Sequence, residues 1–147
     1  MREVAARVHV AAPVPVVWAA VTDWPRQGEW MIGTRVAVVA GDGRSVGSRL
    51  FGFTGLGDVG FLDELEIVEW TPPHRCRARH LGTLLRGSAE FDVSADGSGS
   101  VVRWTERLEP PLGVLGAVGL RVLGPVLVLG MRRSLRRLAA VVTRPAG

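Results

Sequence analysis

Residues 84–108 read LLRGSAEFDVSADGSGSVVRWTERL. Apolar and polar side chains alternate from Leu84 to Ser94 and again from Val101 to Leu108, as they do in half-buried β-strands. Asp96-Gly97-Ser98-Gly99 lies between the two runs and is rich in turn residues. So short a connection predicts an antiparallel hairpin. The positions predicted to face the interior are Leu85, Gly87, Ala89, Phe91, Val93, Val102, Trp104, Glu106 and Leu108.

Further strands precede this hairpin and a long helix follows it. Strands are predicted at 3–10, 34–40, 49–54, 62–70 and 75–80, with two short helices after the first strand, from Pro15 to about Thr22 and up to Trp30. Beyond the hairpin, apolar residues recur every three or four positions, and Pro125 is expected to kink or split the helix that they form. The members of this stripe are Leu127, Met131, Leu135, Leu138 and Val142.

Two of the strands leave their facing undecided. In the strand at 49–54, an outward Arg49 conflicts with inward Phe51 and Phe53. In the strand at 62–70, either Leu65 and Ile67 or Val68 and Trp70 face the interior. Alternation by itself does not choose between these arrangements.

Composition restricts the class of protein. The 147 residues are 47% hydrophobic, which fits one folded domain over 1–147, and the single Cys76 allows no disulfide within the chain. The net charge is +4 and the arginines are spread over many strands without a stacking motif, so no nucleic-acid partner is predicted. The N-terminus has no apolar signal core, and a cytoplasmic location is expected. No cofactor and no metal are predicted.

One stretch of the sequence is apolar enough to raise the alternative of a membrane-spanning helix. Residues 112–131 are almost uncharged and about long enough to cross a bilayer. Arg121, Pro125 and five glycines argue against a spanning helix. The following Arg132, Arg133, Arg136 and Arg137 are interpreted as a solvated helix face, with peripheral contact to an anionic membrane, such as the inner membrane face, as the alternative.

The order of elements and several short motifs resemble one family. Ala12-Pro13 with Val17-Trp18 and Thr22-Asp23, the glycine-rich hairpin 41–47, and Glu69-Trp70-Thr71-Pro72-Pro73 are similar to the START and birch-pollen-allergen superfamily, also called SRPBCC. The glycine-rich segment lacks the Lys-Ser/Thr and the following helix of a phosphate-binding loop. The resemblance covers nearly the whole chain and is strongest to short bacterial members of the polyketide cyclase/dehydrase and lipid-transport type.

The resemblance implies an α+β helix-grip fold, with a seven-stranded antiparallel sheet wrapped around a long C-terminal helix and two short helices after strand one. It implies a carrier or sequestering protein that binds a hydrophobic small molecule, a lipid or polyketide, between the sheet and that helix. The alternatives are a cyclase or dehydratase and an accessory protein docking on a membrane or enzyme. Catalysis and oligomeric state are left open, because the fold alone does not settle activity.

Glu106 and His80 are the candidate acid/base residues. Glu106 is a carboxylate on an otherwise apolar face, where burial is costly unless the group is paired or protonated. A salt bridge or a place at the cavity mouth is the alternative to a functional role. The expected pairing places Cys76, Ala89 and Glu106 in one row, so a His80–Glu106 pair is neither implied nor excluded.

A wider set of residues is expected to contact the ligand, although ordinary core packing explains its aromatic members equally well. These residues are Trp30, Leu65, His80, Phe91, Trp104, Glu106 and Met131. His74, Cys76 and His80 share one strand face, but alternate residues lie about 7 Å apart, too far for a tight metal site. Cys76 is interpreted as a small buried hydrophobe.

Overall fold

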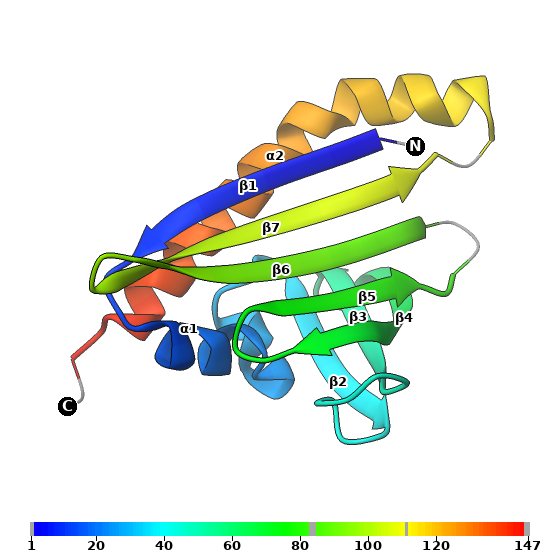
Figure 1. The fold of residues 1–147 in the computed structure, drawn as a ribbon. Coiled ribbons are helices and arrows are strands. Elements are labelled where there is room, and N and C mark those ends of the chain that lie inside the picture. Colours follow the sequence, from blue (N-terminus) through cyan, green and yellow to red (C-terminus); the bar gives the residue numbers. More distant parts are fainter. Residues whose placement is uncertain (1, 83–84, 111, 146–147) are drawn as a thin grey trace.

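The computed structural model describes residues 2–82, 85–110 and 112–145, and Figure 1 shows their arrangement. The strands are β1 (Arg2–Val10), β2 (Thr34–Ala40), β3 (Arg49–Leu56), β4 (Val59–Thr71), β5 (Arg75–His80), β6 (Arg86–Asp96) and β7 (Gly99–Glu109). The helices are α1 (Val14–Val21), the 3₁₀ helix η1 (Trp24–Glu29) and α2 (Val114–Val142).

All seven strands form one antiparallel sheet in the order β1-β7-β6-β5-β4-β3-β2. Strands β2 to β7 follow one another as a meander, and β1 pairs with β7 at the far edge. Helix α2 lies along one face of the sheet, while α1 and η1 close one end (Figure 1). The predicted helix-grip α+β fold is therefore confirmed.

Several element boundaries differ from the prediction. Strand β3 continues to Leu56 and strand β4 begins at Val59, so both are longer than predicted. A tight turn at Gly57 and Asp58 replaces the longer loop expected at 55–60. Strand β6 begins at Arg86, and the predicted start at Leu84 lies outside the described residues. Pro125 does not split α2, which runs unbroken from Val114 to Val142.

The undecided facing of the strand at 62–70 is settled by a β-bulge. Ile67 pairs with Ala78, but the next pair is Glu69 with Arg77, so Val68 is the extra residue. A bulge shifts the alternation by one position. Ile67 and Trp70 consequently face the same side, and each of the two arrangements considered from the sequence was half right.

In β3, Leu50 and Gly52 face the interior, and Phe51 faces outward with Arg49. The conflict seen in the sequence disappears, because the two phenylalanines of this strand pack on the outer surface. Phe51 is 38% exposed, and the guanidinium carbon of Arg35 lies 5.0 Å from the centre of the Phe53 ring.

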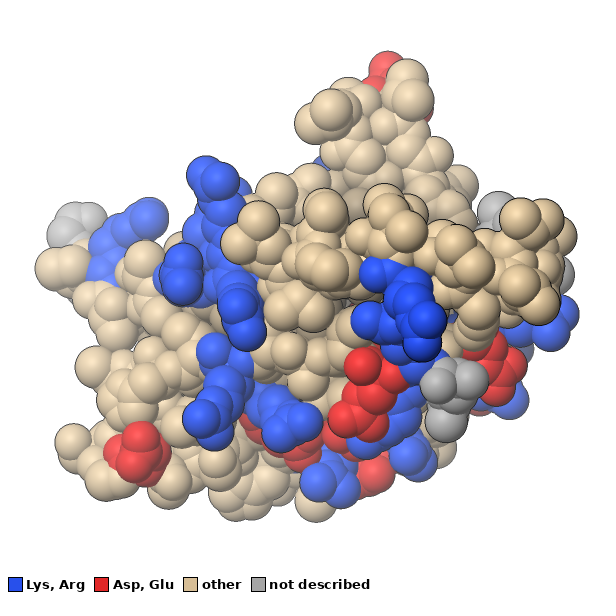
Figure 2. Space-filling view, turned by 90° about the horizontal axis from the view of Figure 1, so that it is seen from above, with Lys and Arg blue, Asp and Glu red and all other residues tan. Residues whose placement is uncertain are grey.

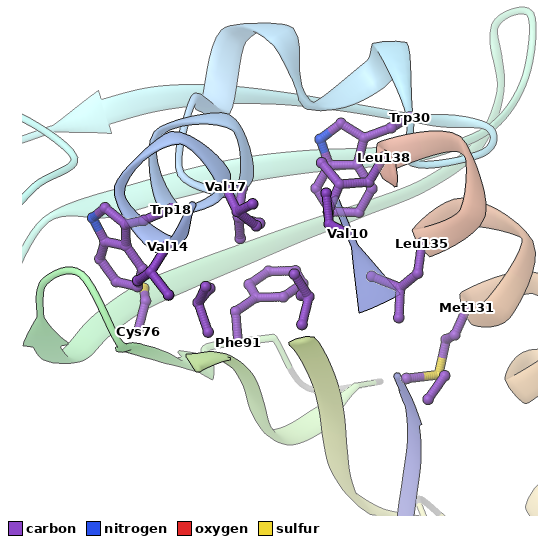
Figure 3. Packing of buried hydrophobic residues seen from close by; sticks show 14 of the residues in the cluster. Val10, Val14, Val17, Trp18, Trp30, Cys76, Phe91, Met131, Leu135 and Leu138 are labelled. Carbon is purple, nitrogen blue, oxygen red and sulfur yellow. The ribbon is translucent and has the colours of Figure 1, made fainter. Parts of the chain in front are cut away.

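The hydrophobic core is formed by residues of the short helices, the sheet and the second half of α2 (Figure 3). Trp18 of α1 packs on Trp70 with ring centres 5.2 Å apart, and Trp30 contacts Phe91 and Trp104 edge-on. The predicted apolar stripe of α2 supplies Met131, Leu135 and Leu138, all of which are buried, to this core.

The predicted pairing of β5 with β6 was wrong by two residues, whereas the predicted pairing of Ala89 with Glu106 is confirmed. Ala78, Ala89 and Glu106 form one row, and His80, Gly87 and Leu108 form the next. The sequence places the turns but not the register within them. This correction moves His80 to the row adjacent to Glu106.

Gly87 is predicted to be required by this arrangement. It has a φ of +117°, and a Cβ atom added there would collide with the backbone carbonyl of Arg107. We expect Gly87→Ala to lower the free energy of unfolding by roughly 3 kcal/mol or more, because backbone strain and overlap add. Urea denaturation followed by circular dichroism measures this change.

The matched control is Gly97→Ala at the β6–β7 turn. Gly97 also has a positive φ (+60°), but its Cβ position is open, so we expect the free energy of unfolding to fall by about 1 kcal/mol. Equal losses for the two variants would show that the close contact at Gly87 contributes nothing.

Candidate functional site

A cavity of about 450 Å³ lies between the inner face of the sheet and α2. Strands β3 to β7 supply most of its wall, and Val126, Leu127, Gly130, Met131 and Ser134 of α2 supply another side. Most of the side chains around it are apolar. The cavity exists because small residues stand on the sheet, among them Gly52, Ala78 and Ala89.

Three ionisable side chains break this apolar wall, and we call them the charged cluster: Asp63 of β4, His80 of β5 and Glu106 of β7. Leu65 pairs with His80, so Asp63 lies two residues further along β4 on the same face. Strand β6 separates His80 from Glu106, but it presents only Gly87 and Ala89 there. With no large side chain between them, the imidazole reaches the carboxylate across the intervening strand.

The hydrogen bonds of the charged cluster are short and continuous. Nδ1 of His80 lies 2.6 Å from Oδ2 of Asp63, and Nε2 lies 3.1 Å from Oε2 of Glu106. The side chain of His80 is 4% exposed, and those of Asp63 and Glu106 are each 13% exposed. Nε1 of Trp104 donates to Oε1 of Glu106 at 3.0 Å and holds the carboxylate from its other side.

The two carboxylates decide the protonation of His80. Burial lowers the pKa of the imidazole, but hydrogen bonds and charge attraction from Asp63 and Glu106 outweigh it and raise the pKa to about 9. The ring is therefore an imidazolium at neutral pH, and both of its N–H groups donate to carboxylates. Both nitrogens are engaged, so His80 is not free to accept a proton from a ligand.

Asp63 has one unsatisfied atom. Among the described residues its Oδ1 is buried and has no hydrogen-bond partner. A buried carboxylate oxygen without a donor costs free energy. The charged cluster can therefore gain from one further hydrogen-bond donor.

The structure places the residues singled out in the sequence as follows. Six of the seven expected ligand contacts line the cavity: Leu65, His80, Phe91, Trp104, Glu106 and Met131. Trp30 does not line it; this residue is 2% exposed and packs behind Phe91 and Trp104. The structure thus brings His80 and Glu106 together, which the predicted register left open.

Sequence reasoning missed Asp63. Phe61, Asp63, Leu65 and Ile67 alternate along the strand. Once Leu65 is known to face inward, this alternation places Asp63 on the inward face too. The bulge at Val68 hid this pattern, because it makes Trp70 appear to contradict it.

The other candidate side chains, Cys76 of β5 and His74 just before it, have ordinary structural surroundings. Burial raises the pKa of the Cys76 thiol to about 12, so this sulfur is not a thiolate at neutral pH. The Nδ1 atom of His74 lies 2.8 Å from the carbonyl oxygen of Val93. Within the described part of the chain, no group of three or more His, Cys, Asp or Glu residues could hold a metal ion.

Comparison with known proteins agrees with this architecture. A family model described as polyketide cyclase/dehydrase and lipid transport matches residues 1–143. Protein TTHA0849 from Thermus thermophilus has a similar structure, with a TM-score of 0.80, 18% identity, and coverage of 96% of this chain and 97% of that chain. No curated protein matches the chain.

Two further solved structures share the fold. The polyketide cyclase-like protein Cgl2372 from Corynebacterium glutamicum has a TM-score of 0.67 at 15% identity and covers 95% of this chain and 90% of that chain. DynU16, a protein of the dynemicin biosynthetic locus, has a TM-score of 0.69 at 22% identity. The match covers 96% of this chain but 47% of DynU16.

The charged cluster predicts a pH dependence of stability. A histidine pKa of about 9 in the folded chain, against 6.5 for the free side chain, stabilises the fold fully below pH 6.5, and this is lost as pH rises through 9. We expect the free energy of unfolding to fall by an amount on the order of 3 kcal/mol between pH 6 and pH 10. Urea unfolding at several pH values measures it.

His80→Gln should remove this loss, because glutamine does not titrate. His9→Gln, at an exposed histidine of β1, is the control for deleting an imidazole elsewhere. If wild type and His80→Gln lose stability equally over this pH range, the imidazolium is not held by the carboxylates.

Proposed function

The chain belongs to the polyketide cyclase/dehydrase and lipid transport family, and on that premise we propose that it binds an apolar small molecule in the cavity beneath α2, as a carrier or sequestering protein. The match over 1–143 and the shared fold also confirm the predicted SRPBCC membership. The observation that carries the proposal is a largely apolar cavity of about 450 Å³ with the charged cluster in its wall. Cavities of roughly 300–1,000 Å³ hold drug-sized ligands.

The wall of the cavity supports an apolar ligand body. Side chains such as Leu65, Phe91 and Met131 offer carbon surface and no hydrogen-bond partners. Transfer of an apolar ligand from water into such surroundings contributes roughly 25 cal/mol for each Å² of apolar surface buried. A lipid chain or a fused-ring polyketide has surface of this kind.

The charged cluster supports a ligand with one donating polar end. Every hydrogen bond that His80 can donate is already made to a carboxylate. What the cluster offers to a ligand is acceptor capacity on the carboxylates of Glu106 and Asp63, both of which line the cavity. A hydroxyl or protonated amine therefore suits this end of the cavity, whereas a ligand carboxylate would be repelled.

One observation favours a second candidate, a cyclase or dehydratase. Both expected acid/base residues reach the cavity, and they are hydrogen-bonded to each other. In that case Glu106 would be the base, because His80 already carries its proton, and His80 would be a positioning residue. The carrier remains the leading proposal, because most of the wall is apolar and both N–H groups of His80 are already bonded to carboxylates.

The decisive experiment is native mass spectrometry of the freshly purified protein, followed by organic extraction. A carrier should retain an apolar molecule, and adding that molecule back to the emptied protein should return it unchanged. Chemical conversion of the extracted molecule by wild type but not by Glu106→Gln would replace the carrier proposal with the enzyme. Absence of any bound molecule, together with no binding of apolar probes, would contradict both.

Filling the cavity should abolish binding. Gly52 lines it, and a Cβ atom there meets only the carbonyl oxygen of Asp63 at 3.8 Å, so a larger side chain has room to enter. We expect Gly52→Leu to weaken binding of N-phenyl-1-naphthylamine, a neutral apolar fluorophore, at least tenfold, because it occupies ligand volume. Fluorescence titration gives the dissociation constants.

Phe51→Leu is the matched control, because it changes the neighbouring residue on the outward side of β3. It should bind the fluorophore as wild type does. Unchanged affinity in Gly52→Leu would place the fluorophore outside this cavity.

A further inference from the structure

The first half of α2 presents an apolar ridge to solvent. Its members follow each other by three or four residues, and each is more than half exposed: Leu115, Val118, Val122, Val126 and Leu129. This spacing places them on one helix face, opposite the buried Gly124 and Met131. Helix α2 is long and apolar enough to cross a membrane by length and composition, and only 11% of its most apolar 18-residue window is buried.

An arginine cluster, Arg132, Arg133, Arg136 and Arg137, continues the helix where the apolar ridge ends. All four side chains are exposed, and within the described residues none of them has a carboxylate within 4 Å. Helix α2 also carries Arg121 and has no acidic residue. Figure 2 shows basic side chains on either side of an uncharged band.

From this combination we propose that the apolar ridge and the arginine cluster dock α2 on an anionic lipid bilayer. The ridge extends from Leu115 to Leu129, about 21 Å at 1.5 Å per residue, and would lie in the boundary between headgroups and acyl chains. The arginine side chains would then meet lipid phosphates, with which guanidinium groups form paired hydrogen bonds. Helices of this type lie in the plane of the membrane interface.

A second copy of the chain fits the same surface less well. Antiparallel pairing of two ridges would place each arginine cluster against the apolar start of the partner helix, and parallel pairing would place the clusters together. Neither arrangement offers an acidic residue from α2, which has none. An anionic bilayer satisfies the apolar ridge and the arginine cluster at once.

The docking surface adjoins the cavity. Val126 belongs to the apolar ridge and also lines the cavity, together with Leu127 and Gly130 of the same helix segment. Docking would therefore bring the cavity wall to the lipid surface. An apolar ligand could then enter from the bilayer with little exposure to water.

Vesicle co-sedimentation of the full chain tests the docking proposal without any cavity ligand. The probes are phosphatidylcholine vesicles with and without about 30% phosphatidylglycerol. We expect at least tenfold stronger partitioning onto the anionic vesicles, decreasing with added NaCl. Replacing Arg133, Arg136 and Arg137 by Gln should weaken this partitioning at least tenfold, and Val122→Gln with Leu129→Gln should do the same.

The control replaces Arg7, Arg44 and Arg86 by Gln, which removes the same charge from exposed positions on the sheet and its loops. This variant should partition as wild type does. Circular dichroism of each variant verifies the fold. The docking proposal would be overturned if the control lost as much partitioning as the arginine-cluster variant. It would also be overturned if the wild type partitioned equally onto neutral and anionic vesicles, or did not partition at all.

Sedimentation equilibrium provides an independent test of the same surface. A monomer in both wild type and the ridge variant supports the bilayer as partner. A wild-type dimer that the ridge variant dissociates would overturn the proposal in favour of a second copy. Either result leaves the fluorophore titration unaffected, so failure of docking is distinguishable from failure of ligand binding.

Discussion

A single helix has to cover the inner face of a seven-stranded sheet, and this mismatch in width shapes the rest of the molecule. Seven strands about 4.8 Å apart extend over roughly 29 Å, whereas a helix with its side chains is about 10–12 Å wide. Helices α1 and η1 close one end of the face, where the tryptophan core lies. The cavity lies beneath the middle of α2, along residues 126–134, between this helix and the sheet.

The ionic groups of the cavity wall are concentrated in the charged cluster. His80 lies between two carboxylates, and Trp104 holds one of them from the other side. Buried ion pairs often contribute little net stability, because desolvation offsets the attraction. They do fix geometry, so the charged cluster presents acceptor atoms in one defined position. An otherwise apolar cavity gains orientation from such a feature, since a ligand with a donating end can bind only one way round.

Helix α2 has two different faces in this arrangement. Its inner face closes the core through Met131, Leu135 and Leu138, and the apolar part of its outer face has no partner within the described chain. A helix that is apolar on both faces is ordinarily buried on both. The exposed ridge, the adjoining arginines and the cavity wall at Val126 therefore belong to one surface, and the anionic bilayer that we propose as its partner matches both its apolar and its basic part.

The sequence predicted much of the candidate site but not its assembly. Strand alternation placed Phe91, Trp104 and Glu106 toward the interior, and helical spacing did the same for Met131; all four line the cavity. Alternation did not place Asp63, because the bulge at Val68 interrupts it in that strand. Trp30 was expected in the cavity wall, but it packs edge-on against Phe91 and Trp104 and does not line the cavity.

The order of the elements and the inward face of most strands follow from the sequence alone, because the period of two in a strand and the spacing of three or four in a helix are local properties. The pairing of Ala78 with Ala89 and the meeting of His80 with two carboxylates depend instead on the tertiary structure. Strand register depends on contacts between residues far apart in the chain. A slip of two residues preserves every inward and outward face, so alternation cannot detect it.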